Sequence, residues 1–126
     1  MHDQPTVDEL VQAVKNFVDE IAMKELTGRS AFLALVTSNV LGTILRDLEA
    51  RQGNDEEEKA RLSELLGSAK TSNLLEMNKE LQRRIRDGDL TVSSPGLMAH
   101  LKKTAIAQLQ VDQPNYSALQ KALKEP

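Results

Sequence analysis

Residues 5–28, PTVDELVQAVKNFVDEIAMKELTG, decide the fold class. Along this stretch, apolar side chains recur every three or four residues, which is the spacing of one face of an α-helix. Thr6 and Glu9 have the spacing of a capping box, and Gly28 suits the left-handed conformation that follows many helices. We therefore predict a helix from Val7 to about Thr27. Its apolar stripe consists of Val7, Leu10, Val11, Val14, Phe17, Val18 and Ile21.

The same spacing continues through the rest of the chain, and strand patterns are almost absent. The sequence therefore predicts an all-α fold, a single-domain bundle of about five helices with a short C-terminal helical tail. We expect Gly53 and Asn54 to end one helix and begin the next. The further predicted helices cover residues 29–52, 55–66, 73–86 and 95–111, and residues 68–72 are a predicted loop. The single domain spans residues 1–126, with an N-terminal fringe at 1–5 and a tail at 112–126 that packs on the bundle.

The helix over residues 29–52 is expected to be the most buried one, because its apolar residues cover well over half of its circumference. Small residues on this helix allow a neighbouring helix to approach closely, and we expect that neighbour to belong to the same chain. Gly42 costs about 1 kcal/mol relative to alanine inside a helix, so a packing reason is expected for it. Asn39 is interpreted first as a buried hydrogen-bonding post and second as a ligand contact. The small residues are Ala31, Ala34, Ser38 and Gly42.

Composition excludes several classes of function. Cysteine is absent, which removes disulfides, thiolate metal sites and thiol nucleophiles. The net charge of −3 and the three aromatic residues argue against nucleic-acid binding by phosphate contacts or base stacking. The acidic N-terminal stretch is unlike a signal peptide, and the longest uncharged stretch, residues 30–45, is short and polar for a membrane span. We expect a cytoplasmic protein that binds neither nucleic acid nor membrane.

No arrangement of residues typical of catalysis is present in the sequence. The six glycines are isolated, so no phosphate-binding glycine loop is predicted. His100 has no histidine or carboxylate three or four residues away, which excludes a metal pair on its helix. It is expected at the surface, because the inner face of that helix is assigned to Leu97, Met98, Leu101, Ala105 and Leu109. We therefore predict no enzyme, no metal and no cofactor.

Five segments resemble a family of small bacterial helical proteins of unknown function. The family is encoded beside acyl-CoA dehydrogenases and aminoglycoside-phosphotransferase-like kinases, and the resemblance covers nearly the whole chain. It implies an accessory role near acyl-CoA catabolism. Leu35 departs from the family pattern, where arginine is expected. The similar segments are PTVDELVQAVKNFVDE (5–20), GRSAF (28–32), VTSNVL (36–41), MNKELQRRIR (77–86) and VDQPNY (111–116).

Two hypotheses of function remain open from the sequence. The first is a non-catalytic accessory or interaction protein that self-associates or binds a partner protein. The alternative is a small-molecule binding module for an acyl- or CoA-like ligand. Tyr116 is expected to bury its ring in a structured turn. The candidate binding residues of the alternative are Asn39, Arg83, Arg86, Asp112 and Tyr116.

Overall fold

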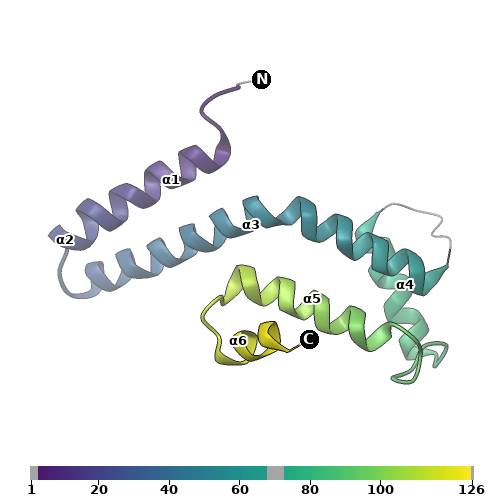
Figure 1. The fold of residues 1–126 in the computed structure, drawn as a ribbon. Helices are drawn as coiled ribbons and strands as arrows, with labels where there is room; N and C mark the ends of the chain where they lie inside the picture. The colour runs from purple at the N-terminus through teal and green to yellow at the C-terminus, as the bar shows by residue number, and fades with distance from the viewer. Residues whose placement is uncertain (1–2, 68–72, 126) are drawn as a thin grey trace. The chain divides into compact units, whose positions relative to one another are not determined.

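The computed structural model describes residues 3–67 and 73–125, and over these ranges the chain is all-α with no strand. With the unbroken helical stretch of residues 7–25 counted once, the described part of the chain is 81% helical and contains five helices, which confirms the predicted all-α fold class. The chain divides into two compact units, Met1–Ala50 and Arg51–Pro126, and each is described by itself. The one-domain boundary remains a prediction, and the predicted loop at 68–72 lies outside the described residues. The elements are α1 (Val7–Phe17), the π-helical segment η1 (Val18–Ala22), α2 (Met23–Glu25), α3 (Gly28–Leu66), α4 (Leu74–Arg86), α5 (Leu97–Asp112) and α6 (Ser117–Lys124) (Figure 1).

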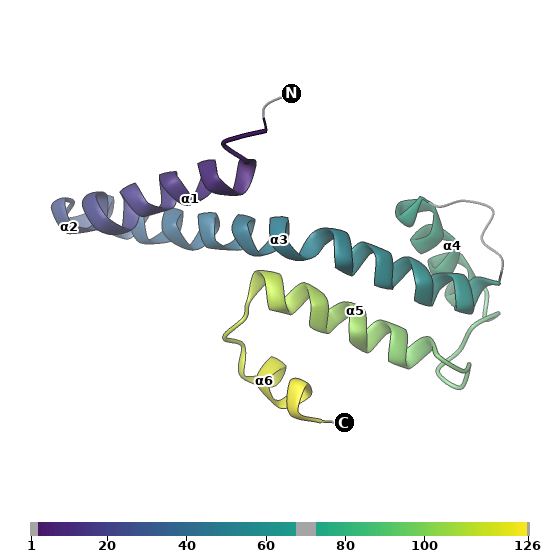
Figure 2. The same cartoon turned by 45° about the horizontal axis from the view of Figure 1, so that its top comes forward.

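The first unit is a helical hairpin. The predicted capping box begins it: the backbone N–H of Thr6 donates to the Glu9 carboxylate at 2.7 Å, and the N–H of Glu9 donates to the Thr6 hydroxyl at 3.4 Å. Elements α1, η1 and α2 follow one another without a break, and the chain turns at Leu26, which is extended. Gly28 then adopts a φ of 59°, the left-handed conformation that favours glycine. The N-terminal part of α3 runs back beside α1 in both views (Figures 1 and 2).

A polar network joins the two helices of the hairpin. The Lys15 ammonium lies 2.5 Å from the Asp19 carboxylate and donates to the Ser38 hydroxyl at 3.2 Å. Ser38 donates in turn to Asp19. These hydrogen bonds lower the pKa of Asp19, the one from Lys15 contributing most. Two of the four predicted small residues, Ser38 and Gly42, therefore lie beside Lys15 of the same chain, while the close approach through the whole row remains a prediction.

The apolar stripe of the first helix lies on the surface and does not form a core. Only Val18 is buried, and Val11 is half-buried. The row facing α3 contains Lys15 and Asp19 beside Val18, so polar and apolar side chains share the hairpin contact. The expectation that residues 29–52 form the most buried helix is also wrong, because most of their large apolar side chains are exposed. The other stripe residues, Val7, Leu10, Val14, Phe17 and Ile21, are between 45 and 62% exposed.

The predicted break at Gly53 and Asn54 does not occur, because α3 is one helix of 39 residues. A hydrogen bond of 3.1 Å between the side chains of Gln52 and Glu56 spans the predicted boundary. One glycine costs about 1 kcal/mol in a helix interior, and this is small against a hydrogen-bond ladder that is complete on both sides. Good N-cap residues therefore did not start a new helix here.

The second unit contains a small apolar core. Its buried members are Leu62 of α3, Met77 and Leu81 of α4, and Leu97 of α5. The predicted start of α4 is confirmed, since the Asn73 side chain accepts from the N–H of Glu76 at 3.2 Å.

Helix α5 begins two residues later than predicted. Gly96 precedes it with a φ of 85°, while the Ser94 hydroxyl accepts from the N–H of Thr91 in the turn. The buried residues of α5 are Leu97, His100 and Val111, whereas Met98 and Leu101 are exposed. The inner face of α5 is therefore turned about the helix axis relative to the predicted one, and it includes His100. Helix α6 lies beside α5 and buries Leu119.

Candidate functional site

The first candidate site is an exposed apolar surface on the hairpin. We define the apolar face as five residues of α1 and η1 together with five of α3. Val7 of α1 and Leu48 of α3 line one open cavity of about 540 Å³, so the two sets meet at that end of the hairpin. The same cavity is also lined by Leu45 and by the polar side chains of Asp8, Gln12 and Glu49. Large contiguous apolar patches on soluble proteins mark interaction surfaces. The apolar face consists of Val7, Leu10, Val14, Phe17 and Ile21 with Leu33, Val36, Val40, Ile44 and Leu48.

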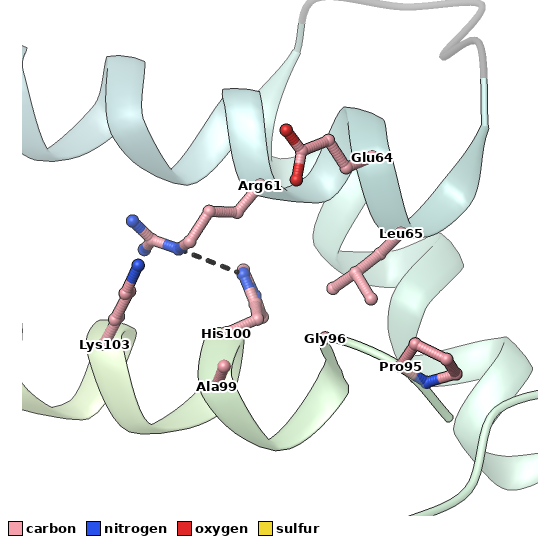
Figure 3. Close-up of a pocket in the computed structure, with 8 residues that line it drawn as sticks. All are labelled: Arg61, Glu64, Leu65, Pro95, Gly96, Ala99, His100 and Lys103. Atoms are coloured by element: carbon pink, nitrogen blue, oxygen red, sulfur yellow. Dashed lines mark hydrogen bonds between the residues drawn. The ribbon is translucent and has the colours of Figure 1, made fainter. Parts of the chain in front are cut away.

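The second candidate site is a cavity of about 180 Å³ in the second unit, between α3 and the start of α5 (Figure 3). Its basic groups are Arg61 from α3 and Lys103 from α5, and a hydrogen bond joins Arg61 to His100 (Figure 3). A carboxylate, that of Glu64, also lines it. The lining residues are Arg61, Glu64, Leu65, Pro95, Gly96, Ala99, His100 and Lys103.

His100 is 2% exposed and is held by an arginine. Nε of Arg61 donates to Nδ1 of His100 at 3.4 Å, and Nη2 of Arg61 donates to the Thr104 hydroxyl at 3.3 Å. Burial lowers the pKa of His100, the positive charge of Arg61 lowers it further, and Glu58 opposes the shift. The imidazole is therefore neutral at pH 7, with Nδ1 as an acceptor.

The cavity can hold a small anionic group beside the guanidinium and the ammonium. Its volume of about 180 Å³ is below the several hundred Å³ of pockets that enclose whole drug-sized ligands. It therefore fits a carboxylate or phosphate group rather than a complete cofactor. The sequence did not point to this site, because the wrong inner face of α5 placed His100 at the surface. The usable signal was the spacing of Leu97, His100 and Thr104, which puts them on one side of a helix.

The five candidate binding residues from the sequence line neither cavity. Asn39 belongs to the first unit and is exposed, which contradicts its interpretation as a buried post. Its backbone carbonyl accepts from the Thr43 hydroxyl at 3.2 Å, as an ordinary residue of α3. Their role as one binding site remains a prediction.

Arg83 lies among carboxylates at the end of α4. It contacts Glu80 at 2.8 Å, Asp87 at 2.9 Å and Asp89 at 3.6 Å. Hydrogen bonds from Arg83 and Arg84 lower the pKa of Glu80 to about 2. The carboxylates of Glu80 and Asp87 in turn raise the pKa of Arg83. An anionic ligand at Arg83 has to compete with these acids.

The remaining three candidates are exposed. Arg86 ends α4. The Asp112 carboxylate accepts from the Gln108 amide at 2.6 Å. Tyr116 is 48% exposed, so the predicted burial of its ring is wrong. The segment is nevertheless structured, because Tyr116 precedes α6 and the backbone carbonyl of Tyr116 accepts from the N–H of Leu119 at 3.0 Å.

Within the described ranges, no group of three or more His, Cys, Asp or Glu side chains is placed to hold a metal ion. One described helix, α3, has an 18-residue window of mean hydropathy 1.3 and is long enough to cross a membrane. Residues 30–45 are short for a membrane span, whereas α3 as a whole, with 39 residues, is not. The cytoplasmic location remains a prediction.

Comparison with known proteins places the chain in a family without a described activity. No curated protein and no solved structure matches it. A family model described as a domain of unknown function, DUF6285, matches residues 24–116, which is most of the chain. The chain therefore belongs to the DUF6285 family.

Proposed function

We propose that this chain is a non-catalytic accessory protein that assists a partner enzyme and whose apolar face is a protein-binding surface. The observation that carries the proposal is the orientation of the α1 stripe. Five large apolar side chains at helical spacing face solvent, while the contact with α3 is made by the polar network of Lys15, Asp19 and Ser38 beside the buried Val18. Exposed apolar stripes are costly to leave in water, so a covering surface is expected in the cell.

The chemistry of the apolar face suits a protein partner. The core of a protein interface is poor in charged residues and rich in large apolar ones. All ten residues of the apolar face are apolar, and no charged residue occurs between Ser30 and Leu45. This composition gives little to a polar substrate that must be held by specific hydrogen bonds.

The partner class follows from the resemblance to bacterial proteins encoded beside acyl-CoA dehydrogenases. We place the chain in the cytoplasm as an accessory of acyl-CoA catabolism. In this role it supplies binding surface, and the enzyme supplies the chemistry.

The test is to mix the purified chain with a purified acyl-CoA dehydrogenase and to measure the masses of the species by light scattering after size exclusion. We expect a peak that contains both proteins. The chain alone is expected to leave an acyl-CoA substrate unchanged. Separate elution of chain and enzyme at micromolar concentration contradicts the accessory role, and turnover by the chain alone contradicts its non-catalytic nature.

The cavity at His100 supports the second candidate function, the binding of the anionic part of an acyl- or CoA-like ligand. Arg61 and Lys103 supply positive charge, and the buried, uncharged His100 also lines the cavity. The probes are inorganic phosphate and coenzyme A, and the NMR chemical shift of the His100 ring measures the binding of each. Lys103→Gln is expected to weaken binding about 10-fold, because one charged contact is lost. Lys102→Gln is the matched control, since Lys102 pairs with Glu125 and does not line the cavity.

A further inference from the structure

We infer that the apolar face is covered by a second copy of this chain, so that two α1–α3 hairpins form an intermolecular four-helix bundle. The inference rests on the proposed function, because it names a second copy of the chain as the protein that the apolar face binds. A partner enzyme then meets the dimer at another surface. It is carried by the spacing of the exposed side chains, the area they expose and the absence of charge among them.

The spacing of the α1 stripe matches helix–helix packing in bundles. Val7, Leu10, Val14, Phe17 and Ile21 are separated by three, four, three and four residues. This alternation is the a and d pattern of helices that pack with interlocking side chains around a shared core. The stripe has no such partner within the hairpin, where α3 packs on the row of Lys15 and Val18 instead.

Helix α3 continues the same surface. Its five members of the apolar face, Leu33 to Leu48, follow one another at three or four residues. Helices α1 and α3 run antiparallel (Figures 1 and 2). We infer from helical geometry, at 100° per residue, that both stripes lie on the same side of the hairpin. Two helices that present one apolar side make half of a four-helix bundle, and a second hairpin completes it.

The exposed area is sufficient for a stable dimer. The ten residues of the apolar face are between 37 and 62% exposed. At about 80 Å² for roughly half of each residue's surface, they offer on the order of 800 Å² per copy, the usual share of one partner in a specific interface.

The charge distribution favours a second copy over a charged partner. A symmetric dimer brings the same patch together from both sides, so any charge in the patch meets its own sign. The apolar face carries none, and residues 30–45 of α3 are uncharged. The acids Asp8 and Glu49 line the cavity at the Val7–Leu48 end of the apolar face, away from its middle. Self-pairing therefore carries no cost from like charges at its centre.

The experiment measures the mass of the full chain by sedimentation and light scattering, in the native form and in two double variants. Val14→Glu/Phe17→Glu places two carboxylates in the apolar face. Ala13→Glu/Asn16→Glu places the same charges one residue earlier on α1, where both side chains are exposed outside it. We expect the native chain at twice 14.0 kDa, a helical monomer for the first variant, and a dimer for the control. The dissociation constant of the first variant should rise by at least about 100-fold.

A second measurement uses the native chain alone, so that a folding defect in a variant does not decide the result. The fluorescence of the apolar dye ANS per mole of protein should rise as the protein is diluted below the dissociation constant of the dimer, because the apolar face becomes free. A dimer that survives Val14→Glu/Phe17→Glu overturns the inference, because the copies then meet elsewhere. A native chain that is monomeric also overturns the inference. In that case the amount of dye bound shows whether the apolar face is free or covered.

Three results with a native monomer have different meanings for the proposed function. Strong dye binding leaves the apolar face open to another protein, so the proposed function survives without self-pairing. Weak dye binding means that the chain's own residues 51–126 cover the apolar face, and both proposals fail. Partition into phosphatidylcholine vesicles that Val14→Glu/Phe17→Glu abolishes assigns the apolar face to a membrane, and both proposals fail.

Discussion

Nε of Arg61 donates a hydrogen bond to Nδ1 of His100, which brings a permanent positive charge to a buried imidazole. A cation beside the ring and the burial of the ring both oppose its protonation. The Arg61–His100 pair therefore makes the second unit sensitive to pH between the unfolded and folded pKa of His100.

The sign of this pH dependence follows from linkage. The folded pKa of His100 is lowered from its ordinary value of 6.5, so the unfolded chain binds the proton more tightly. The contribution of His100 to the free energy of unfolding is full above pH 6.5 and is lost as the pH falls through the folded pKa. Urea unfolding at pH 7.5, 6 and 5 should show a steeper loss for the native chain than for His100→Gln. NMR titration of the His100 ring should give a midpoint below 6.5, and a midpoint above it would refute the assignment.

Gly42 gives a paired test of the hairpin contact. A Cβ at this position lies 3.3 Å from Nη1 of Arg46, a flexible side-chain end, and 3.6 Å from Cε of Lys15. Gly42→Ala is expected to raise the free energy of unfolding by about 0.5–1 kcal/mol through helix propensity. Gly42→Leu is expected to lower it by about 1–3 kcal/mol, because the larger side chain meets the Lys15 stem. Thermal melting measures both, and equal stability of the two variants would mean that α1 does not pack there.

Gly53 tests whether α3 is continuous. No heavy atom lies within 4 Å of a Cβ built at Gly53, and its φ is not positive. Gly53→Ala should therefore stabilise the chain by about 1 kcal/mol, and Gly53→Pro should destabilise it by about 3 kcal/mol. Ala60→Gly, at an exposed position of α3, is the reverse control and should cost about the same as Gly53→Ala gains. A lower melting temperature for Gly53→Ala would indicate a helix end at this residue.

Tyr116 reports on the segment before α6. It is the single tyrosine of a chain without tryptophan, so its fluorescence can be followed directly. Because its ring is 48% exposed, iodide should quench the native chain nearly as well as the urea-unfolded chain. Leu119→Ala should lower stability by about 2–5 kcal/mol while leaving the quenching of the folded form unchanged, since Leu119 is the buried residue of α6. Protection of Tyr116 from iodide would show that another surface covers it.

Local signals in the sequence were sufficient for much of the fold. The Thr6–Glu9 capping box and the Asn73 cap form between residues three apart, so their chemistry is complete in the sequence. The end of the first helix before Gly28 is local in the same sense, because a positive φ is a property of one residue. The break predicted at Gly53 did not form although its signals were equally local. A cap side chain stabilises a helix start little where the backbone N–H groups already have hydrogen-bond partners within a continuous helix.

The surroundings of each helix face were decided by the tertiary structure. A repeat of three and four residues shows that Val7, Leu10 and Val14 share one side of α1, but it contains no information on what lies opposite. The hairpin placed Lys15 and Ser38 at its contact and left the stripe outside. The same reason applies to α5, where the choice of inner face decided whether His100 was at the surface or buried beside Arg61. Periodicity is set by bonds along the chain, whereas burial depends on residues far away in sequence, and only the assembled structure brings those together.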